Sequence, residues 1–196
     1  MDELNDQHYI KLIIGGDINA FAILVDRYKN LVFTLSLKML ASCEEAEEVS
    51  QDVFIKIYKS LSGFKTESKF STWLYRITYN TCLDRLRTTK RTAYLVAVED
   101  FEAQEVTSLM NALDTIEEKE RKQMIQKCLD LLPAEDNFLL TLYYFQENSL
   151  KEISKIMGIN ENNVKIKLFR SRRKLAGILK TQLEPEIINQ YEKQGR

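Results

Sequence analysis

Helix-breaking residues are scarce in this chain, and their scarcity limits its possible folds more than any other feature. Only six glycines and two prolines occur among the 196 residues. Alternating β-branched runs, which are typical of strands, are few, whereas apolar residues recur every three or four positions over long stretches. The sequence therefore predicts an all-α protein.

Residues that accept backbone N–H groups mark where several helices begin. Asp17 follows a glycine pair, and Ser42 and Ser149 each precede a glutamate by three positions, which is the spacing of a capping box. Apolar residues at helical spacing follow these caps. They are Phe21, Leu24, Val25, Tyr28, Leu31, Val32 and Leu35, then Ala46, Val49, Val53 and Ile57, and later Ile153, Ile156 and Met157.

These signals divide the chain into two small helical domains joined by an acidic linker. We predict a first domain over residues 1–91, with a loop at 61–69 before a helix at 71–87. A linker over 92–121 leads to a second domain over 122–180, and 181–196 form a tail. In the second domain Pro133 ends one helix, another covers 138–145, and a turn at 158–160 completes a helix-turn-helix whose last helix runs from Glu161 to about Leu179.

Charge is segregated along the chain although the formal net charge is only −1. Residues 65–91 carry seven basic and two acidic side chains, and residues 151–180 carry nine basic and two acidic. Between them, residues 92–120 carry eight acidic side chains and one basic. Two basic segments around an acidic one are typical of a protein that contacts a polyanion at two places.

Other classes of protein find little support in the sequence. No apolar run approaches the roughly 18 residues of a membrane span, and the N-terminus lacks the layout of a signal peptide, so we expect a cytoplasmic protein without membrane insertion. The cysteines Cys43, Cys82 and Cys128 are too scattered to indicate disulfides or zinc. The only histidine, His8, lies in an N-terminus expected to be frayed. We therefore expect no catalytic residue, no metal and no cofactor.

The last predicted helix has two different faces. At about 100° per residue, Val164, Leu168, Ser171 and Leu175 point inward. The outward arc and its flanks contain amides, arginines, two apolar side chains and lysines, which suit adenine, guanine, thymine methyl groups and phosphates respectively. These outward and flanking residues are Asn162, Asn163, Lys165, Ile166, Lys167, Phe169, Arg170, Arg172, Arg173 and Lys174. The pattern predicts a helix that reads duplex DNA.

The helix at 71–87 mixes aromatic and basic residues. We expect Trp73 and Ile77 to be buried, and Tyr75, Arg76, Tyr79 and Asn80 to be exposed. Aromatic rings beside cations bind unstacked single strands, and the small polar loop before the helix is suited to holding a flipped base.

Both basic segments resemble one family. The run "EEAEEVSQDVFIKIYKSLSGF", followed by "FSTWLYRITYNTCLDRLR", resembles the second domain of the extracytoplasmic-function (ECF) sigma factors of bacterial RNA polymerase. The run "LDLLPAEDNFLLTLYYFQENSLKEISKIMGINENNVKIKLFRSRRKL" resembles their fourth domain, and the resemblance spans roughly residues 15–180.

The resemblance implies a role for each segment in promoter-specific transcription initiation. Gln51, Asp52 and Ile55 would dock on the clamp helices of the largest polymerase subunit, and the fourth domain on the flap. The minus-ten element, partly melted, would be bound by Phe64, Lys65, Thr66, Glu67, Ser68, Lys69, Arg76, Tyr79, Asn80, Arg85 and Arg87. The minus-thirty-five duplex would be bound by Asn162, Asn163, Lys165, Ile166, Lys167, Phe169, Arg170 and Arg173. The linker would thread towards the polymerase cleft, and an anti-sigma factor is a further expected partner.

The chain departs from the family pattern at two places, and two other functions stay open. Asn162 and Asn163 stand where the family often has Gly-Thr, and Asn137 stands where an arginine is common, so the preferred bases and one phosphate contact do not carry over.

A free-standing regulator whose first domain dimerises or senses a ligand is one alternative, and an enzyme is the other. The regulator would bind an operator tightly without polymerase.

Overall fold

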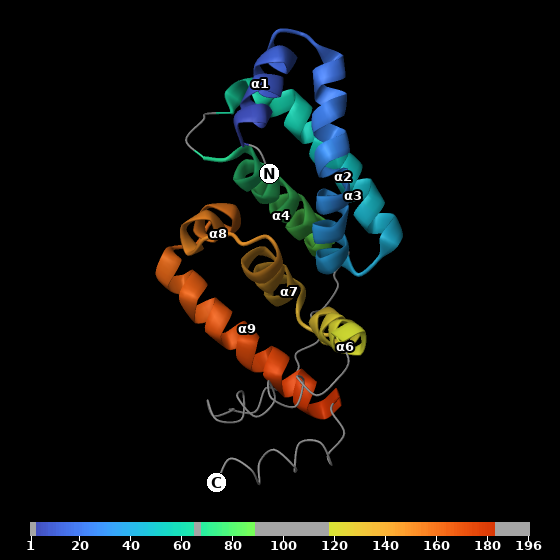
Figure 1. The fold of residues 1–196 in the computed structure, drawn as a ribbon, viewed down its shortest axis with the longest axis vertical. Coiled ribbons are helices and arrows are strands. Elements are labelled where there is room, and N and C mark those ends of the chain that lie inside the picture. Colours follow the sequence, from blue (N-terminus) through green and yellow to red (C-terminus); the bar gives the residue numbers. More distant parts are fainter. Residues whose placement is uncertain (1–2, 65–67, 89–117, 183–196) are drawn as a thin grey trace. The chain divides into compact units, whose positions relative to one another are not determined.

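The computed structural model describes residues 3–64, 68–88 and 118–182 (Figure 1). Every regular element within these ranges is a helix, which confirms the all-α prediction for the described part of the chain. The elements are α1 (Glu3–Ile14), α2 (Ile18–Leu40), α3 (Cys43–Ser60), the 3₁₀ turn η1 (Leu61–Gly63), α4 (Phe70–Thr88), α6 (Glu118–Asp130), α7 (Ala134–Leu140), the π-helical η2 (Thr141–Phe145), α8 (Leu150–Met157) and α9 (Glu161–Gln182).

The chain groups into two compact units. One contains residues 1–92 and 141–164, and the other contains residues 93–140 and 165–196. The domain boundaries expected near residues 91 and 122 stay a prediction. Most of the predicted linker lies outside the described residues, but residues 118–121 already belong to α6.

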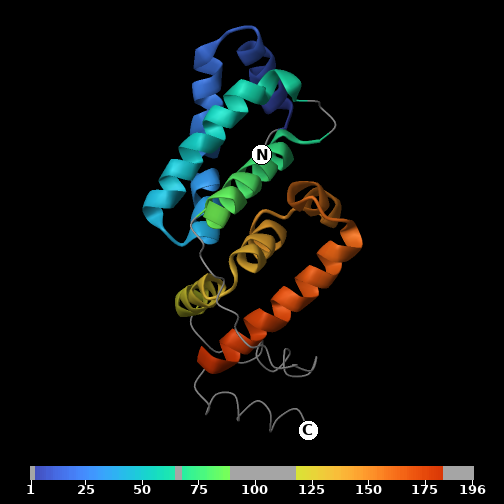
Figure 2. The same cartoon turned by 180° about the vertical axis from the view of Figure 1, so that it is seen from behind.

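In the first unit, α2 and α3 run antiparallel and both pack against α4 (Figures 1 and 2). Their facing stripes are fully buried, with Leu24 and Val32 from α2, Val53 and Ile57 from α3, and Leu74 from α4 at most 1% exposed. Each such aliphatic side chain stabilises the fold by about 1.5–3 kcal/mol. The predicted apolar stripes of α2 and α3 are therefore largely the ones that the core uses.

The predicted caps begin the helices as expected. Asp17 Oδ1 accepts the N–H groups of Asn19 and Ala20 at 2.9 and 3.2 Å. Ser42 Oγ accepts the Glu45 N–H at 3.4 Å. At α8 the capping box is complete.

Helix α1 was not predicted, and the expectation of a frayed N-terminus is wrong for residues 3–14. Asp6 is 3% exposed and forms an ion pair with Arg27 on α2. It also accepts a 2.5 Å hydrogen bond from the Tyr28 hydroxyl. Burial and this hydrogen bond raise the pKa of Tyr28 far above its ordinary value. The Asp6 carboxylate thus holds α1 against α2, while His8 stays exposed.

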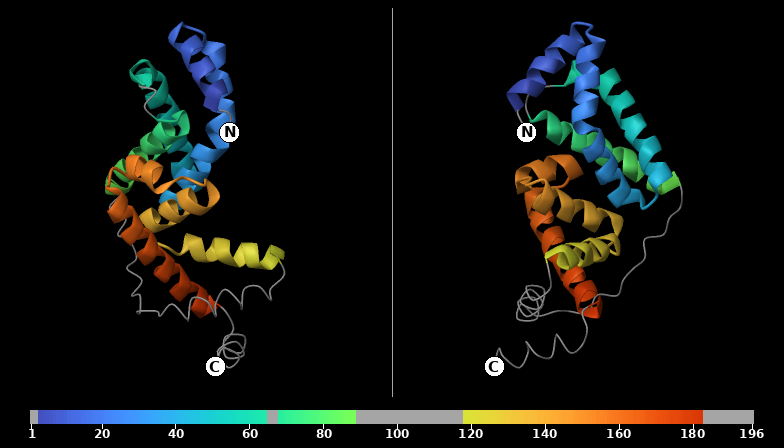
Figure 3. Two further views of the ribbon diagram at one scale, coloured as in Figure 1. Left: turned by 60° about the vertical axis from the view of Figure 1, so that its left-hand side comes forward. Right: turned by 45° about the vertical axis from the view of Figure 1, so that its right-hand side comes forward.

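In the second unit, α7 begins directly after Pro133, whose carbonyl accepts the N–H groups of Asp136 and Asn137 at 2.9 and 3.0 Å. The helix expected at 138–145 therefore starts four residues earlier, as α7, and its last five residues form η2. Figure 3 shows the course of α6, α7 and α9 from two further directions. Phe138 and Leu139 are completely buried.

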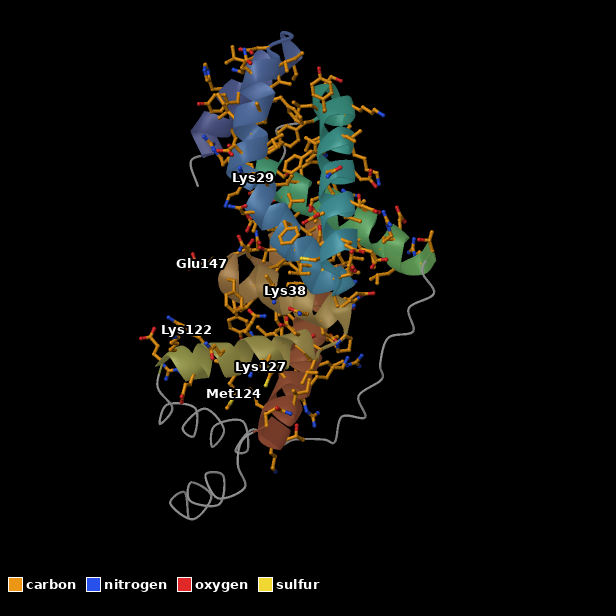
Figure 4. The ribbon with its side chains drawn as sticks, turned by 90° about the vertical axis from the view of Figure 1, so that its right-hand side faces the viewer. Lys29, Lys38, Lys122, Met124, Lys127 and Glu147 are labelled. Carbon is orange, nitrogen blue, oxygen red and sulfur yellow. The ribbon has the colours of Figure 1, made fainter. Side chains whose placement is uncertain are left out.

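Lysines also occur on helices outside the predicted DNA-binding segments, as Figure 4 shows for Lys29 and Lys38 on α2 and Lys122 and Lys127 on α6. Lys122 pairs with Glu118 four positions earlier at 2.5 Å. Such pairs are typical of a solvated helix face. Positive charge alone therefore does not locate the functional surfaces.

Candidate nucleic-acid interface

Helix α9 has the two faces that its sequence predicts. Val164 and Ser171 are fully buried, and Leu168 is 3% exposed. On the opposite side Ile166 is 49% and Phe169 59% exposed. Asn162, Asn163, Lys165 and Arg170 are exposed as well. Ile166 and Phe169 lie exposed together among amides and arginines, and contact with another molecule would remove their apolar surface from water.

Arg173 lies beside this row rather than at its centre. Its guanidinium carbon is 5.7 Å from the centre of the Phe169 ring, which is cation–π geometry. The side chain is half-buried. Leu175, which was expected to point inward, is half-buried too.

A glycine turn leads from α8 into α9, as predicted. Gly158 has φ +69°, which is the left-handed conformation that ends many helices, and its N–H donates to the Ser154 carbonyl at 2.9 Å. Asn160 then begins α9, because its Oδ1 accepts the Asn163 N–H at 2.7 Å. The turn thus fixes where α9 and its exposed side start.

Two of the lysines that flank the face are engaged by carboxylates within the second unit. Lys167 forms an ion pair with Glu135, and Lys174 pairs with Asp136 at 2.6 Å. Lys165, by contrast, is exposed. The lysines that flank the exposed side of α9 are therefore not equivalent.

Helix α4 exposes a second row of polar residues. Arg76, Asn80 and Arg87 are all exposed and recur at helical spacing along one side of the helix. Arg87 Nη1 lies 3.4 Å from Asp84 in the same row. Arg85 is partly buried and pairs with Glu48 of α3 at 2.9 Å. This row can contact a phosphate backbone and offers one amide to a base.

The structure corrects the predicted exposure of the aromatic residues of α4. Tyr75 and Tyr79 were expected to be exposed but are only 3% and 5% exposed, whereas Trp73 and Ile77 were expected in the core and are half-buried. Burial raises the pKa of Tyr75 to about 12. The physical reason is that α4 buries residues around much of its circumference, so no single apolar stripe marks its inner side. A stacking role for Tyr79 would require its ring to become exposed.

An aromatic cluster adjoins the predicted base-capturing loop. The ring of Phe64 lies 5.1 Å from Trp73 and 5.9 Å from Phe70. Lys65, Thr66 and Glu67 lie outside the described residues. Ser68 is half-buried and Lys69 is exposed. The two ends of the loop are thus anchored on packed aromatic rings.

The docking residues expected on α3 share one exposed side. Gln51, Asp52 and Ile55 are exposed, Ile55 by 51%. Tyr58 extends this row, is 49% exposed, and packs its ring 5.0 Å from Phe21 of α2. Tyr58 was not predicted, although residues three positions apart share one side of a helix and Tyr58 follows Ile55 at that spacing.

Metal-binding arrangements do not stand out in the described residues. No group of three or more His, Cys, Asp or Glu side chains there is arranged to hold a metal ion. Cys82 and Cys128 are buried thiols and Cys43 is exposed. Among the same residues, no helix is long and apolar enough to cross a membrane.

Comparisons with known proteins match both candidate DNA-binding segments. The family model for Sigma-70 region 2 matches residues 24–92, and the model for Sigma-70 region 4 matches residues 122–175. The ECF RNA polymerase sigma factor SigW of Bacillus subtilis is 37% identical over 172 residues, which cover 85% of this chain and 92% of that protein.

Two solved structures have a similar fold. CnrH, in a complex with the cytosolic domain of CnrY, matches with a TM-score of 0.60 at 20% identity and covers 91% of this chain and 99% of that one. The sigma factor RpoE of Bartonella quintana, in a complex with the anti-sigma factor NepR, matches with a TM-score of 0.57 at 19% identity, over 83% and 98% of the two chains.

Proposed function

Since this chain belongs to the ECF sigma factors of bacterial RNA polymerase and directs promoter-specific transcription initiation, we propose that α3 docks it on the polymerase while α4 and α9 bind two separate promoter elements. The polymerase performs the chemistry, and this chain adds recognition of the start site. Because two sites on one chain bind one promoter, each raises the effective concentration of the other.

The observation that carries the proposal is the exposed row on α9. Asn162 and Arg170 suit base edges, and Ile166 and Phe169 leave 49% and 59% of their surface in solvent. Contact with thymine methyl groups would remove this apolar surface from water. We assign this row to the duplex of the minus-thirty-five element, with Lys165 and Arg172 on phosphates.

Helix α4 and the loop before it are assigned to the minus-ten element. The exposed row of Arg76, Asn80 and Arg87 suits a phosphate backbone with one base-reading amide. Phe64 and Lys69 stand at the two ends of the loop that would receive a flipped base. Lys65, Thr66 and Glu67 complete this assignment from the sequence alone.

Docking on the polymerase is assigned to the exposed side of α3. Gln51 and Asp52 supply polar contacts beside the apolar surface of Ile55, a combination common at protein interfaces. The clamp helices of the largest subunit are the proposed surface for α3, and the flap is the proposed surface for the fourth domain. The path of the acidic linker towards the polymerase cleft lies outside the described residues and stays a prediction.

Control by an anti-sigma factor is part of the proposal. It is supported by the similar fold of a sigma factor that was solved with its anti-sigma factor. Such a partner would cover surfaces that α3 or α4 needs for initiation. A partner that binds this chain and core polymerase at the same time, without lowering transcription, would contradict the proposed control.

The central experiment is run-off transcription with purified core polymerase and a library of randomised promoters. We expect transcripts only from templates that share two short elements, and the selected templates give the consensus. If the chain binds those templates tightly without polymerase and starts no transcript with it, the free-standing regulator becomes the better interpretation.

Docking is tested by reversing one charge on α3. Asp52→Lys should abolish co-purification with core polymerase and leave the helical content unchanged. Asp26→Lys is the matched control, because Asp26 is a 77% exposed carboxylate on α2 that pairs with Lys29 of the same helix. Undiminished binding of the Asp52→Lys protein would remove α3 from the docking surface.

Base reading is tested by comparing two arginines of α9. Arg170→Ala should weaken promoter binding by roughly 1–3 kcal/mol and relax the preference at one base pair. Arg172→Ala, on the flank of the row, should weaken binding to all sequences alike. A uniform loss for Arg170→Ala as well would make Arg170 a phosphate contact.

A further inference from the structure

Two carboxylates in the first turn of α7 contact one edge of the recognition helix. Glu135 forms an ion pair with Lys167. Asp136 Oδ1 accepts a 2.5 Å hydrogen bond from Ser171 Oγ, and Asp136 Oδ2 lies 2.6 Å from Lys174 Nζ. Glu135 and Asp136, the acidic pair, thus join α7 to α9 within one compact unit.

The two members of the acidic pair differ in burial. The Asp136 side chain is only 7% exposed, whereas Glu135 is 43% exposed. A buried carboxylate requires hydrogen-bond donors, because it has lost its water. Ser171 and Lys174 are those donors, so moving α9 away from Asp136 would leave a buried charge without partners. Asp136 therefore resists movement of α9 more strongly than Glu135 does.

These contacts all lie on one side of α9, so they fix the rotation of the helix about its own axis. At about 100° per residue, Lys167, Ser171 and Lys174 span about 60° of its circumference, and the centre of the exposed row lies about 110° away. Side-chain tips lie about 5–6 Å from the helix axis, so a rotation of about 30° moves them by about 3 Å. The donor–acceptor distance of a hydrogen bond can vary by only about 0.5 Å. A small rotation would therefore take Arg170 out of reach of its base.

We propose that Glu135 and Asp136 are positioning residues that determine the sequence specificity of α9. They hold the helix at the rotation that presents Ile166, Phe169 and Arg170 to the groove. They also engage Lys167 and Lys174, so that these lysines act within the protein and not on phosphates. This inference rests on the proposed reading of the minus-thirty-five duplex by α9, and it replaces the expected DNA contact of Lys167 with an internal one.

The first test measures the salt dependence of promoter binding by the complex of the full chain with core polymerase. Log affinity falls linearly with log salt concentration, and each phosphate contact increases the steepness of this fall by about 0.9. Lys167→Met should leave the slope unchanged, whereas Lys165→Met, at an exposed position on the same helix, should reduce it by about 0.9. Glu135→Gln should steepen the slope, because it releases Lys167. A reduction of about 0.9 for Lys167→Met would overturn the internal role of that lysine.

The second test measures selectivity, as the ratio of affinities for the best minus-thirty-five sequence of the library and for single-base variants of it. Asp136→Asn should lower this ratio about tenfold, because loss of a bidentate base contact has an effect of that order. Ile178→Val is the matched control, since it trims a buried side chain of α9 and should lower stability without changing selectivity. If Asp136→Asn does not fold, Lys174→Met and Ser171→Ala remove the two donors singly, with the same expected loss of selectivity.

A charge exchange separates positioning from the loss of a particular residue. Glu135→Lys and Lys167→Glu should each lower the selectivity, and the double variant should restore it, because the pair is re-formed with its charges reversed. If the wild-type complex shows no preference at the minus-thirty-five element, the proposed function of α9 fails. If the wild type is selective and the Asp136 and Glu135 variants keep its selectivity, the positioning inference alone is overturned.

Discussion

Replacing Gly158 by alanine tests whether the turn before α9 depends on the backbone conformation of one residue. Gly158 has φ +69°, and a Cβ built on it meets no atom within 4 Å. The cost of alanine is therefore the intrinsic cost of the left-handed conformation alone, about 1–2 kcal/mol. Gly158→Asn should cost less, because asparagine tolerates this conformation. Gly63→Ala is the matched control, since Gly63 also has no atom within 4 Å of an added Cβ and is not in the left-handed region.

Amide hydrogen exchange of the intact chain is the appropriate assay, because it reports the local opening of one segment. The Gly158 and Ile159 N–H groups both donate to the Ser154 carbonyl, at 2.9 and 3.3 Å. Protection of this segment should fall about 5- to 30-fold in Gly158→Ala, which corresponds to 1–2 kcal/mol, and should hardly change in Gly63→Ala. Equal protection in the alanine, asparagine and wild-type proteins would refute the left-handed turn and the reasoning built on it.

Two further predictions concern buried groups of the first unit. Asp6→Ala should destabilise the protein by about 2–4 kcal/mol in urea unfolding, because it leaves the buried Tyr28 hydroxyl without an acceptor and Arg27 without its ion-pair partner. Tyr28→Phe should lower the free energy of unfolding by only about 1 kcal/mol. Equal losses for the two variants would argue against the Asp6 network. Cys43 should be the fast-reacting thiol towards dithiodipyridine in the native protein, because Cys82 and Cys128 are buried. Burial raises the pKa of Cys82 from 9.0 to about 11, so its contribution to stability is complete below about pH 9 and is lost as the pH rises towards 11. A fast-reacting thiol in Cys43→Ser, or an alkaline stability profile unchanged in Cys82→Ala, would contradict this assignment.

Local signals in the sequence located most helices and both faces of α9. Caps at Asp17, Ser42 and Ser149 and the turn at Gly158 act through neighbouring residues, so their spacing is visible in the sequence. The two-sided pattern of α9 is visible as well, because residues three and four positions apart share one side of a helix. Caps and turns of this kind depend on contacts between residues at most about five positions apart.

Contacts between distant residues explain what the sequence did not reveal. Helix α1 depends on Asp6, whose partners Arg27 and Tyr28 lie 21 and 22 positions away. Asp136 meets Ser171 and Lys174 across 35 and 38 positions. An acidic residue in the first turn of a helix is ordinary in any sequence, so neither role could be predicted from spacing. The inner side of α4 was misjudged because packing, rather than periodicity, decides it.

The aromatic cluster at the ends of the predicted base-capturing loop has a practical consequence. Trp73 is the only tryptophan of the chain, and it packs half-buried against Phe64 and Phe70. Tryptophan emission of the unlabelled protein, excited selectively over its tyrosines, therefore comes from one indole next to the place where an extruded nucleotide would enter. A short minus-ten oligonucleotide, added to the protein by stopped flow, would report its arrival as quenching or a shift of that emission, without any dye.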